Sequence, residues 1–308
     1  MSKRIVFLYC TQKNKEDLFR CESVMRALLR KFRKSALFSY VQLDASLPCR
    51  SQMSERLLSE TERADAVFLE CDEQNISSSM DLLKDVFGIY ATSQHISGRA
   101  ICYPEKKKSV QNCEESLINT EVYAKENIKR ASLIALKLAK AQRRSLSICL
   151  QPLNELDSLF LREAEYSLCR EKHISSEHIS LNAMIALCVK TIPSFDVVLT
   201  LGEYAPIIAM HLNSLPEIPV GFIVSYAEKL KIFRRQILPC DEINNLHLFS
   251  SVISIASIFE NELEMKSAGA WLKRAVSLAF EKGASDTPDG FIKEITDEIN
   301  SPIRKRKA

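Results

Sequence analysis

Glycine is scarce in this chain of 308 residues, and its scarcity excludes one kind of ligand-binding loop. The sequence holds seven glycines, about a third of the number that an average content of roughly 7% would give. The first of them is Gly88. A loop that wraps its backbone around phosphate groups needs glycine where the chain approaches the ligand closely. The sequence before Gly88 therefore contains no glycine-rich phosphate loop.

Paired cysteine motifs are also missing. The ten cysteines are scattered singly, and no Cys-x-x-Cys spacing occurs. The sequence therefore gives no sign of a zinc ribbon or of a thioredoxin-like dithiol. Several cysteines lie within apolar runs, where a free cysteine behaves as a small hydrophobic residue. We expect these side chains to be free thiols.

The sequence shows no targeting or membrane pattern. Its opening residues, MSKRIVFLYC, lead directly into a charged helix without the long apolar region and cleavage site of a signal peptide. No stretch is apolar enough to cross a bilayer. Together with free thiols, this pattern predicts a cytoplasmic protein in a reducing compartment.

Positively and negatively charged residues are nearly equal in number. Lys and Arg number 42 against 39 Asp and Glu, so the formal net charge is +3. This excess is too small to predict nucleic acid or an anionic membrane as a partner. We interpret the basic runs Lys106 to Lys108 and Arg304 to Lys307 as solvated segments. The Gly-x-Ser-x-Gly, His-Glu-x-x-His and P-loop signatures do not occur.

Strand and helix patterns alternate along the first part of the chain. Continuous apolar runs predict buried strands at Ile5 to Cys10, Leu37 to Leu43 and Ala66 to Cys71. Helical patterns follow each of them, over residues 15–32, 51–62 and 81–90. This order predicts an α/β layer with a parallel sheet.

The pattern changes after Gly98. A short strand at Arg99 to Tyr103 precedes a polar segment, Pro104 to Thr120, which we interpret as a loop or projecting arm. The remaining residues predict helices over 127–143, 157–169, 183–189, 246–259, 262–280 and 291–299, and strands over 146–150, 178–181, 195–200 and 222–224. The strand–helix alternation therefore continues beyond the polar segment.

Four segments carry a family resemblance through their order and spacing. ADAVFLE at residues 64–70 is followed by NTEVYAKENIKRASLIALKLAKAQRR at 119–144, by FDVVLT at 195–200 and by AGAWLKRAVSLAFEKG at 268–283. Together they resemble the isocitrate/isopropylmalate dehydrogenase family. The resemblance implies an isopropylmalate dehydrogenase-like two-domain α/β fold with a largely parallel central sheet. It implies a terminal domain of residues 1–97 plus 218–308, and a central domain of residues 98–217 with a shortened arm and dimerisation helices.

The functional residues of that family are missing at the matching positions. Three acids hold a divalent metal in the family, and the resemblance places Asn182, Pro206 and Met210 there. None of these side chains supplies an anionic oxygen to Mg²⁺ or Mn²⁺. Gln151 takes the place of the proton-handling lysine and does not titrate near neutral pH. Glu203 lies near the lost metal site, where we interpret it as capping the helix that Pro206 begins.

The cofactor motifs are missing as well. The glycine-rich turn that follows the first strand in the family corresponds to Cys10 to Glu16, which contain no glycine. The glycine-rich adenine loop corresponds to Gln236 to Glu242, again without glycine. We therefore expect no bound nicotinamide cofactor and no bound metal.

These observations lead to two main hypotheses. The first is an isocitrate/isopropylmalate dehydrogenase-like pseudoenzyme, catalytically inactive, with a binding, regulatory or structural role. The resemblance implies a homodimer or a hetero-oligomer with an active relative. The alternative is a divergent NAD(P)-dependent oxidoreductase that acts on a 2-hydroxy acid through a rebuilt site, with NAD(P) and Mg²⁺ or Mn²⁺ bound. A plain interaction module is a third interpretation, since a fold does not determine a function.

Overall fold

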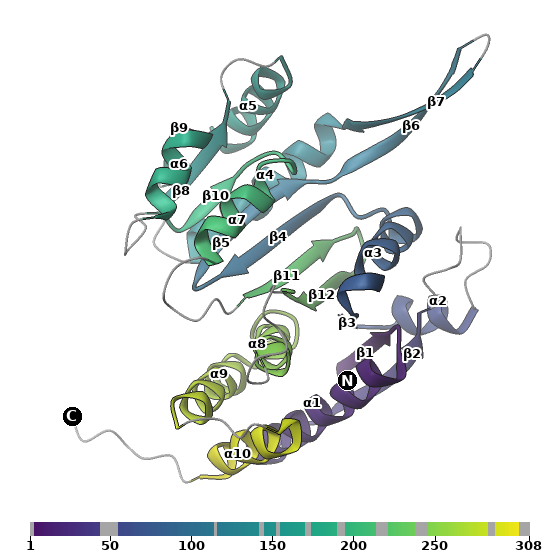
Figure 1. The fold of residues 1–308 in the computed structure, drawn as a ribbon, viewed down its shortest axis with the longest axis vertical. Helices are drawn as coiled ribbons and strands as arrows, with labels where there is room; N and C mark the ends of the chain where they lie inside the picture. Colours follow the sequence, from purple (N-terminus) through teal and green to yellow (C-terminus); the bar gives the residue numbers. More distant parts are fainter. Residues whose placement is uncertain are drawn as a thin grey trace. The chain divides into compact units, whose positions relative to one another are not determined.

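The computed structural model describes ten stretches of the chain: residues 3–43, 55–113, 116–141, 145–151, 155–169, 174–189, 195–213, 221–237, 246–282 and 287–301. The basic tail Arg304 to Lys307 and the Leu238 to Glu242 part of the expected adenine loop lie outside the described residues. The chain has an α/β fold with a largely parallel sheet (Figure 1), which confirms the predicted fold class.

The chain divides into two compact units. Unit 1 comprises residues 1–87, 220–222 and 228–308, and unit 2 comprises residues 88–219 and 223–227. Both ends of the chain therefore belong to unit 1. Residues 88–97 belong to unit 2. The domain boundaries expected from the sequence assign them to the terminal domain.

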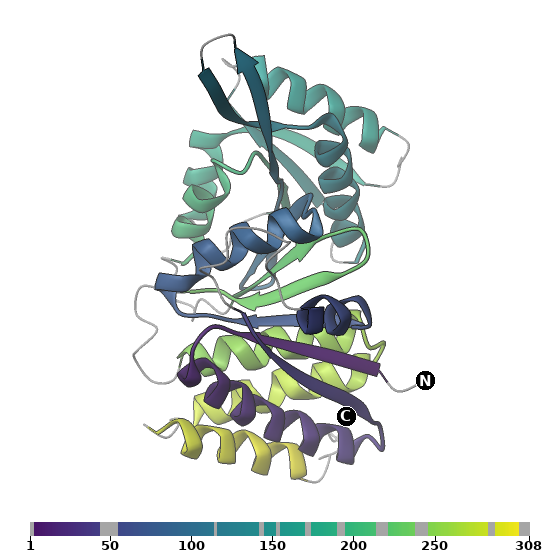
Figure 2. The ribbon, with the colours of Figure 1, turned by 90° about the vertical axis from the view of Figure 1, so that its right-hand side faces the viewer.

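Unit 1 is built on four parallel strands in the order β2-β1-β3-β12. The strands are β1 (Lys3–Tyr9), β2 (Ala36–Gln42), β3 (Ala66–Glu70) and β12 (Lys231–Arg235). The helices are α1 (Gln12–Lys31), α2 (Glu55–Glu62), α3 (Glu73–Phe87), α8 (Leu246–Asn261), α9 (Lys266–Glu281) and α10 (Pro288–Asn300). Figure 2 shows α1 beside α10, the two helices in contact.

The strands of unit 1 are buried because helices cover the apolar side chains that they present. All five residues of β3 are buried, as are Ile5 to Tyr9 of β1. Such continuous burial is typical of parallel strands. Helix α1 begins at a capping box, in which the Thr11 hydroxyl accepts from the Asn14 backbone N–H and the Asn14 side chain accepts from the Thr11 backbone N–H. The cap fixes where β1 ends and α1 begins.

Unit 2 holds a mixed sheet in the order β11-β4-β5-β10-β8-β9. Its strands are β4 (Ala91–Ile96), β5 (Arg99–Pro104), β8 (Ser145–Leu150), β9 (Ser175–Ser180), β10 (Val197–Leu199) and β11 (Gly221–Tyr226), with residues 223–226 of β11 in this unit. Strands β4 and β5 form an antiparallel hairpin, whereas β5, β10, β8 and β9 run parallel to one another. A separate hairpin consists of β6 (Lys106–Cys113) and β7 (Ser116–Tyr123).

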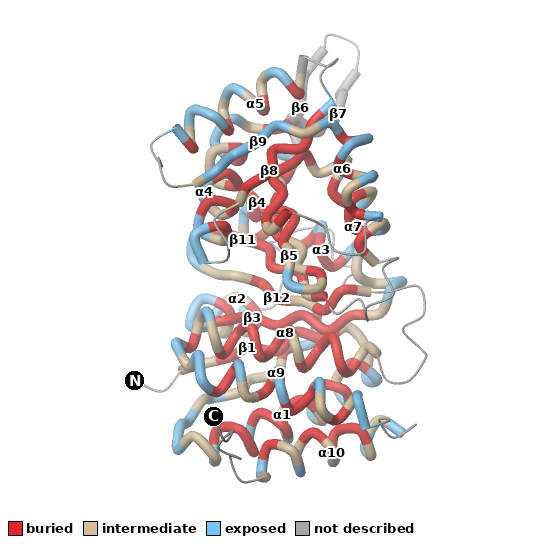
Figure 3. Tube along the Cα trace, turned by 90° about the vertical axis from the view of Figure 1, so that its left-hand side faces the viewer, coloured by how far each residue is buried: buried red, intermediate tan, exposed pale blue. Residues whose placement is uncertain are grey.

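Helices cover both faces of the unit 2 sheet. The helices are α4 (Lys125–Ala141), α5 (Glu155–Leu168), α6 (Leu181–Cys188) and α7 (Ala205–Asn213). Leu146 and Ile148 of β8 pack with α4 and α5, whereas Cys149 packs with α6 and α7. Alternate side chains of one strand thus enter two different cores, as the pleat of a strand requires. Strands β5, β8 and β10 are accordingly buried over most of their length, whereas β9 at the edge of the sheet is exposed (Figure 3).

Several elements differ from the sequence-based expectations. The segment expected to be a loop or arm, Pro104 to Thr120, forms most of the β6–β7 hairpin. Strand β4 was missed because its side chains include Thr92, Ser93 and Gln94, and β12 was missed because it is short and basic. Among the described residues, no helix combines the length and apolar character that a bilayer span requires.

Candidate functional site

The carboxyl ends of β5, β10, β8 and β9 meet at one edge of the unit 2 sheet, because these four strands are parallel neighbours. In open α/β sheets, ligands bind outside the carboxyl ends of the strands. The segments that follow these strands carry Glu105, Thr200 to Tyr204, Gln151 and Leu181. This edge is therefore where a ligand site is expected first.

Tyr123, the last residue of β7, is held at the loop that follows β10. Its hydroxyl donates to Glu203 Oε2 at 2.5 Å and accepts from the Gly202 backbone N–H at 2.9 Å. A Cβ atom on Gly202 would lie 2.8 Å from the Tyr123 hydroxyl, so glycine permits this approach. Burial, and then the hydrogen bond to Glu203, raise the pKa of Tyr123. Tyr123 therefore remains a protonated donor.

Tyr204 and Asp157 form a second tyrosine–carboxylate pair. The Tyr204 hydroxyl donates to Asp157 Oδ2 at 3.1 Å, and Asp157 is only 1% exposed. Burial raises the pKa of Asp157, against the lowering effects of Tyr204 and of the Gln151 backbone N–H. Burial and the neighbouring Asp157 raise the pKa of Tyr204 to about 12. The second oxygen, Asp157 Oδ1, is buried without a hydrogen-bond partner among the described residues.

Glu105, which follows β5, is tied into the sheet. Its Oε1 accepts from the Thr92 hydroxyl at 2.6 Å, and its backbone carbonyl accepts from Asn127 Nδ2 at 2.8 Å. The Thr92 hydroxyl also lies 3.2 Å from the Ser225 hydroxyl. Glu105 is thus linked directly to β4 and α4, and through Thr92 to β11.

The five positions singled out by the sequence all follow strands of this edge. Gln151 comes directly after β8, and Asn182 is the second residue of α6, which follows β9. Glu203 lies in the turn before α7, and Pro206 and Met210 lie on that helix. All five residues are exposed, Met210 with 63% of its surface. The carboxylate of Glu203 contacts Tyr123, a hydrogen bond that the capping interpretation did not include.

Sequence reasoning missed Tyr123, Asp157 and Tyr204. They come from the end of β7, the first turn of α5 and the loop after β10. No local spacing connects these segments, so only the fold brings the three side chains together. Among the described residues, no group of three or more His, Cys, Asp or Glu side chains is placed to hold a metal ion.

A cavity of about 290 Å³ opens elsewhere in unit 2, on the sheet face that α4 and α5 cover. Its lining is Leu136, Leu146, Ile148, Glu165, Leu168, Cys169, Ile174, Ser176 and His178. Glu165 Oε1 lies 3.1 Å from His178 Nε2, and both side chains are about half exposed. The cavity therefore combines an apolar floor with a polar rim.

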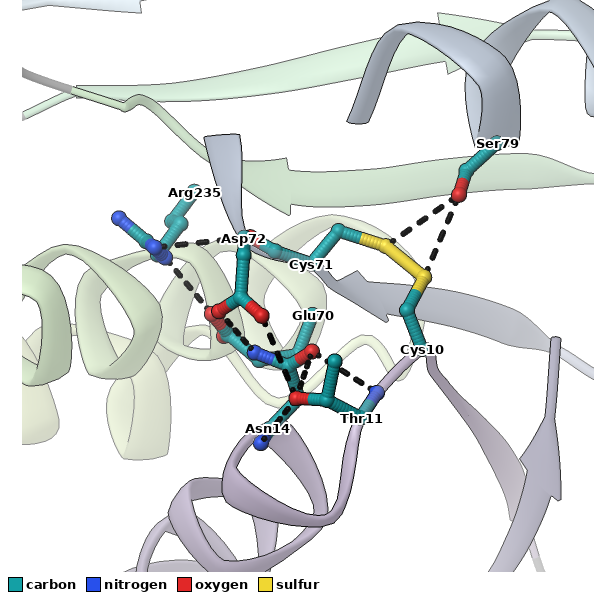
Figure 4. Close-up of a disulfide and its surroundings, with 8 residues drawn as sticks. All are labelled: Cys10, Thr11, Asn14, Glu70, Cys71, Asp72, Ser79 and Arg235. Carbon is teal, nitrogen blue, oxygen red and sulfur yellow. Dashed lines mark hydrogen bonds and ion pairs between the residues drawn. A yellow bond between two sulfur atoms is a disulfide. The ribbon is translucent and has the colours of Figure 1, made fainter. Parts of the chain in front are cut away.

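In unit 1, the turns after β1 and β3 meet around a disulfide. Cys10 and Cys71 are bonded, with their Cα atoms 5.6 Å apart (Figure 4). The expectation of free thiols is therefore wrong for this pair, because the fold brings together two cysteines 61 residues apart that no local motif connects. Among the cysteines whose side chains the structure describes, the free thiols are Cys21, Cys102, Cys149, Cys169 and Cys188.

A buried ion pair lies next to this disulfide. Arg235 Nε donates to Glu70 Oε1 at 2.6 Å, and the Ser251 hydroxyl donates to Glu70 Oε2 at 2.7 Å. Burial raises the pKa of Glu70, and Arg235 opposes that effect. The pair is desolvated and hydrogen-bonded, which is how a protein stabilises a buried charge. It ties β3 to β12 and α8.

Among the comparisons with known proteins, only solved structures are similar to this chain. No family model matches the chain, and no curated protein matches it. Among solved structures, the TT0538 protein from Thermus thermophilus is similar with a TM-score of 0.78 and 14% identity, over 99% of this chain and 69% of that one. A beta-decarboxylating dehydrogenase from Thermococcus kodakarensis, in its apo form, is similar with a TM-score of 0.69 and 15% identity, over 96% of each chain. The chain therefore has a fold like that of a beta-decarboxylating dehydrogenase.

Proposed function

We propose that this chain is a catalytically inactive member of the isocitrate/isopropylmalate dehydrogenase family with a binding, regulatory or structural role. The observation that carries the proposal is the side-chain chemistry at the carboxyl edge of the unit 2 sheet. Asn182, Pro206 and Met210 follow its strands where the resemblance expects three metal carboxylates. The neighbouring carboxylate, Glu203, accepts a hydrogen bond from Tyr123.

Metal-assisted oxidation of a hydroxy acid needs anionic oxygens around a hard cation. An amide, a proline ring and a thioether do not supply them. Gln151 has no proton to exchange near neutral pH, so it cannot replace a general acid or base. These residues support a site that binds without the oxidation step.

Turnover assays test this proposal. The purified full chain would be incubated with isopropylmalate, isocitrate, malate or tartrate, with NAD or NADP, and with Mg²⁺ or Mn²⁺. Reduced cofactor would be followed by its absorbance, and the beta-decarboxylating dehydrogenase from Thermococcus kodakarensis would serve as the positive control. We expect no rate above background for this chain. A rate that is proportional to protein concentration would overturn the proposal.

The tyrosine–carboxylate pairs favour one alternative, a divergent NAD(P)-dependent oxidoreductase with a rebuilt site. Tyr123 and Tyr204 remain protonated at the carboxyl edge, and each donates its single O–H to a carboxylate. A polar ligand would accept from either O–H by replacing Glu203 or Asp157 as the acceptor. A thermal-shift screen with NAD and NADP separates the two proposals, because a ligand of the folded state raises its melting temperature. A saturable shift with either cofactor favours the enzyme, and its absence favours the inactive protein.

For the assembly, we propose a homodimer or a hetero-oligomer with an active relative, in the cytoplasm. The support is the family resemblance in the segment 119–144, which contains α4, and the similarity of the fold to that of a dehydrogenase. Light scattering after size exclusion would give the mass of the particle against the 34.9 kDa of one chain. A monomer at every protein concentration contradicts the homodimer. For the hetero-oligomer, the same measurement would be repeated after mixing with the relative.

A further inference from the structure

Cys10 and Cys71 stand at equivalent positions of two neighbouring strands. The parallel register of β1 and β3 ends with Tyr9 opposite Glu70, so each cysteine is the next residue of its strand. A Cα–Cα distance of 5.6 Å lies within the range of disulfides. The bond therefore links the turn from β1 to α1 with the turn from β3 to α3.

The two cysteine residues differ in their exposure to solvent. Cys10 is partly exposed, whereas Cys71 is 2% exposed. The hydroxyl of Ser79, a fully buried residue of α3, lies 3.2 Å from Cys10 Sγ and 3.5 Å from Cys71 Sγ (Figure 4). A small thiol can thus approach Cys10, while Ser79 can donate a hydrogen bond to a thiolate that forms on Cys71.

In addition to the disulfide, hydrogen bonds join the same two turns. Asn14 Nδ2 donates to Asp72 Oδ1 at 2.8 Å, and the Thr11 hydroxyl lies 3.3 Å from Asp72 Oδ2 (Figure 4). The ladder between β1 and β3 also runs up to the residues before the cysteines. The cysteines therefore stay close together when the disulfide opens, and they can form it again.

We propose that Cys10 and Cys71 are a reversible thiol-exchange site for a low-molecular-weight thiol such as glutathione. The thiolate of the small molecule attacks Cys10 Sγ, a mixed disulfide forms there, and Cys71 leaves as a thiolate that takes up a proton. A second small thiol attacks the mixed disulfide, which releases the Cys10 thiol and the oxidised small-molecule disulfide. Two small thiols are oxidised and one protein disulfide is reduced, with two electrons and two protons transferred. Opening the bond loosens the link between the two turns.

Differential alkylation of the folded full-length chain tests the exchange. The protein would be equilibrated in buffers with graded ratios of reduced to oxidised glutathione, free thiols would be blocked, and the remaining disulfide would be reduced and labelled with a second reagent. Mass spectrometry of the peptides around each cysteine then gives the oxidised fraction. We expect Cys10 and Cys71 to change together and reversibly, while exposed Cys169 shows no linked change. A pair that stays bonded in excess reduced glutathione, or reduced in excess oxidised glutathione, contradicts the proposal.

Single variants identify the sulfur that is attacked. In oxidised glutathione, Cys71→Ser should trap a glutathione adduct on Cys10 with release of one reduced glutathione, because the resolving thiol is missing. Cys10→Ser should leave Cys71 largely unmodified over the same time, because that sulfur is buried. Circular dichroism would check that both variants are folded, and the wild-type titration decides whether the exchange itself occurs even if they are not. Faster modification of Cys71 in Cys10→Ser than of Cys10 in Cys71→Ser would overturn the assignment of Cys10.

Discussion

At the scale of single residues, Glu203 and Tyr204 are adjacent in sequence but take opposite roles in two hydrogen bonds. Glu203 accepts from Tyr123, and Tyr204 donates to Asp157. The loop after β10 is thereby fixed to both β7 and α5. Such partly buried polar pairs favour one arrangement of a loop, because a buried partner left unpaired would lose its solvation.

Gly202→Ala tests how closely Tyr123 approaches this loop. The new Cβ would lie 2.8 Å from the Tyr123 hydroxyl, so we expect a loss of about 1–3 kcal/mol in the free energy of unfolding. Urea denaturation would measure it. Tyr123→Phe removes the hydroxyl and serves as the partner in a double-mutant cycle. If Gly202→Ala has the same effect in the Tyr123→Phe background, the clash is not its cause.

Asp157→Asn tests the protonation state of the buried carboxyl. The folded chain holds the pKa of Asp157 above its ordinary value of 3.8, so the neutral form is favoured on folding. That stabilisation is present below the ordinary pKa and is lost as pH rises through the folded pKa. As pH rises from about 4 to about 7, the wild type should therefore lose this stabilisation, whereas Asp157→Asn should not. The free energy of unfolding of Asp157→Asn should increase relative to that of the wild type over this range. A difference that does not vary with pH, measured by urea denaturation, contradicts this.

At the scale of elements, α8 and α9 approach closely enough to exclude a methyl group. A Cβ on Gly269 of α9 would lie 2.6 Å from the Ala256 carbonyl oxygen of α8, and it would also meet the Glu260 side chain. Helix α8 is apolar on nearly all sides and buried over most of its length, as expected of a core helix. A glycine in α9 allows the two helices to pack at short range.

Gly269→Ala separates helix propensity from packing. In an open helix this change would stabilise the chain by about 1 kcal/mol. Here we expect the opposite sign, a loss of about 1–3 kcal/mol, because the new carbon contacts backbone that cannot move aside. Urea denaturation gives the sign, and Ser267→Ala at an exposed position of α9 is the matched control. Stabilisation by Gly269→Ala would show that α8 and α9 are less close than described.

The disulfide affects two strand–helix turns at once. It closes a loop of 61 residues in sequence separation, and such a crosslink typically contributes about 2–4 kcal/mol by restricting the unfolded chain. We expect reduction to lower the free energy of unfolding by that amount, measured in urea with and without reductant. The double variant Cys10→Ser/Cys71→Ser should not respond to the reductant. An equal response in that variant would assign the effect to another group.

At the scale of the whole molecule, sequence patterns predicted the long buried elements well. Strands such as Ile5 to Tyr9 and the amphipathic helix that begins near Asn127 have periodic apolar side chains over many residues. The polar pairs were not predictable, because Tyr123, Asp157 and Tyr204 come from three distant segments. The same is true of Cys10 and Cys71, which only the β1–β3 register brings together.

The central claim concerns the carboxyl edge of the unit 2 sheet, where Asn182, Pro206 and Met210 provide no anionic oxygen. Titration of the purified chain with Mn²⁺, followed by the electron paramagnetic resonance signal of the free ion, tests it directly. A protein with a known Mn²⁺ site would be the positive control. We predict that the free-ion signal rises in proportion to added Mn²⁺, as in buffer alone. Saturable binding of about one Mn²⁺ per chain, at concentrations at which the control protein binds, would contradict the account.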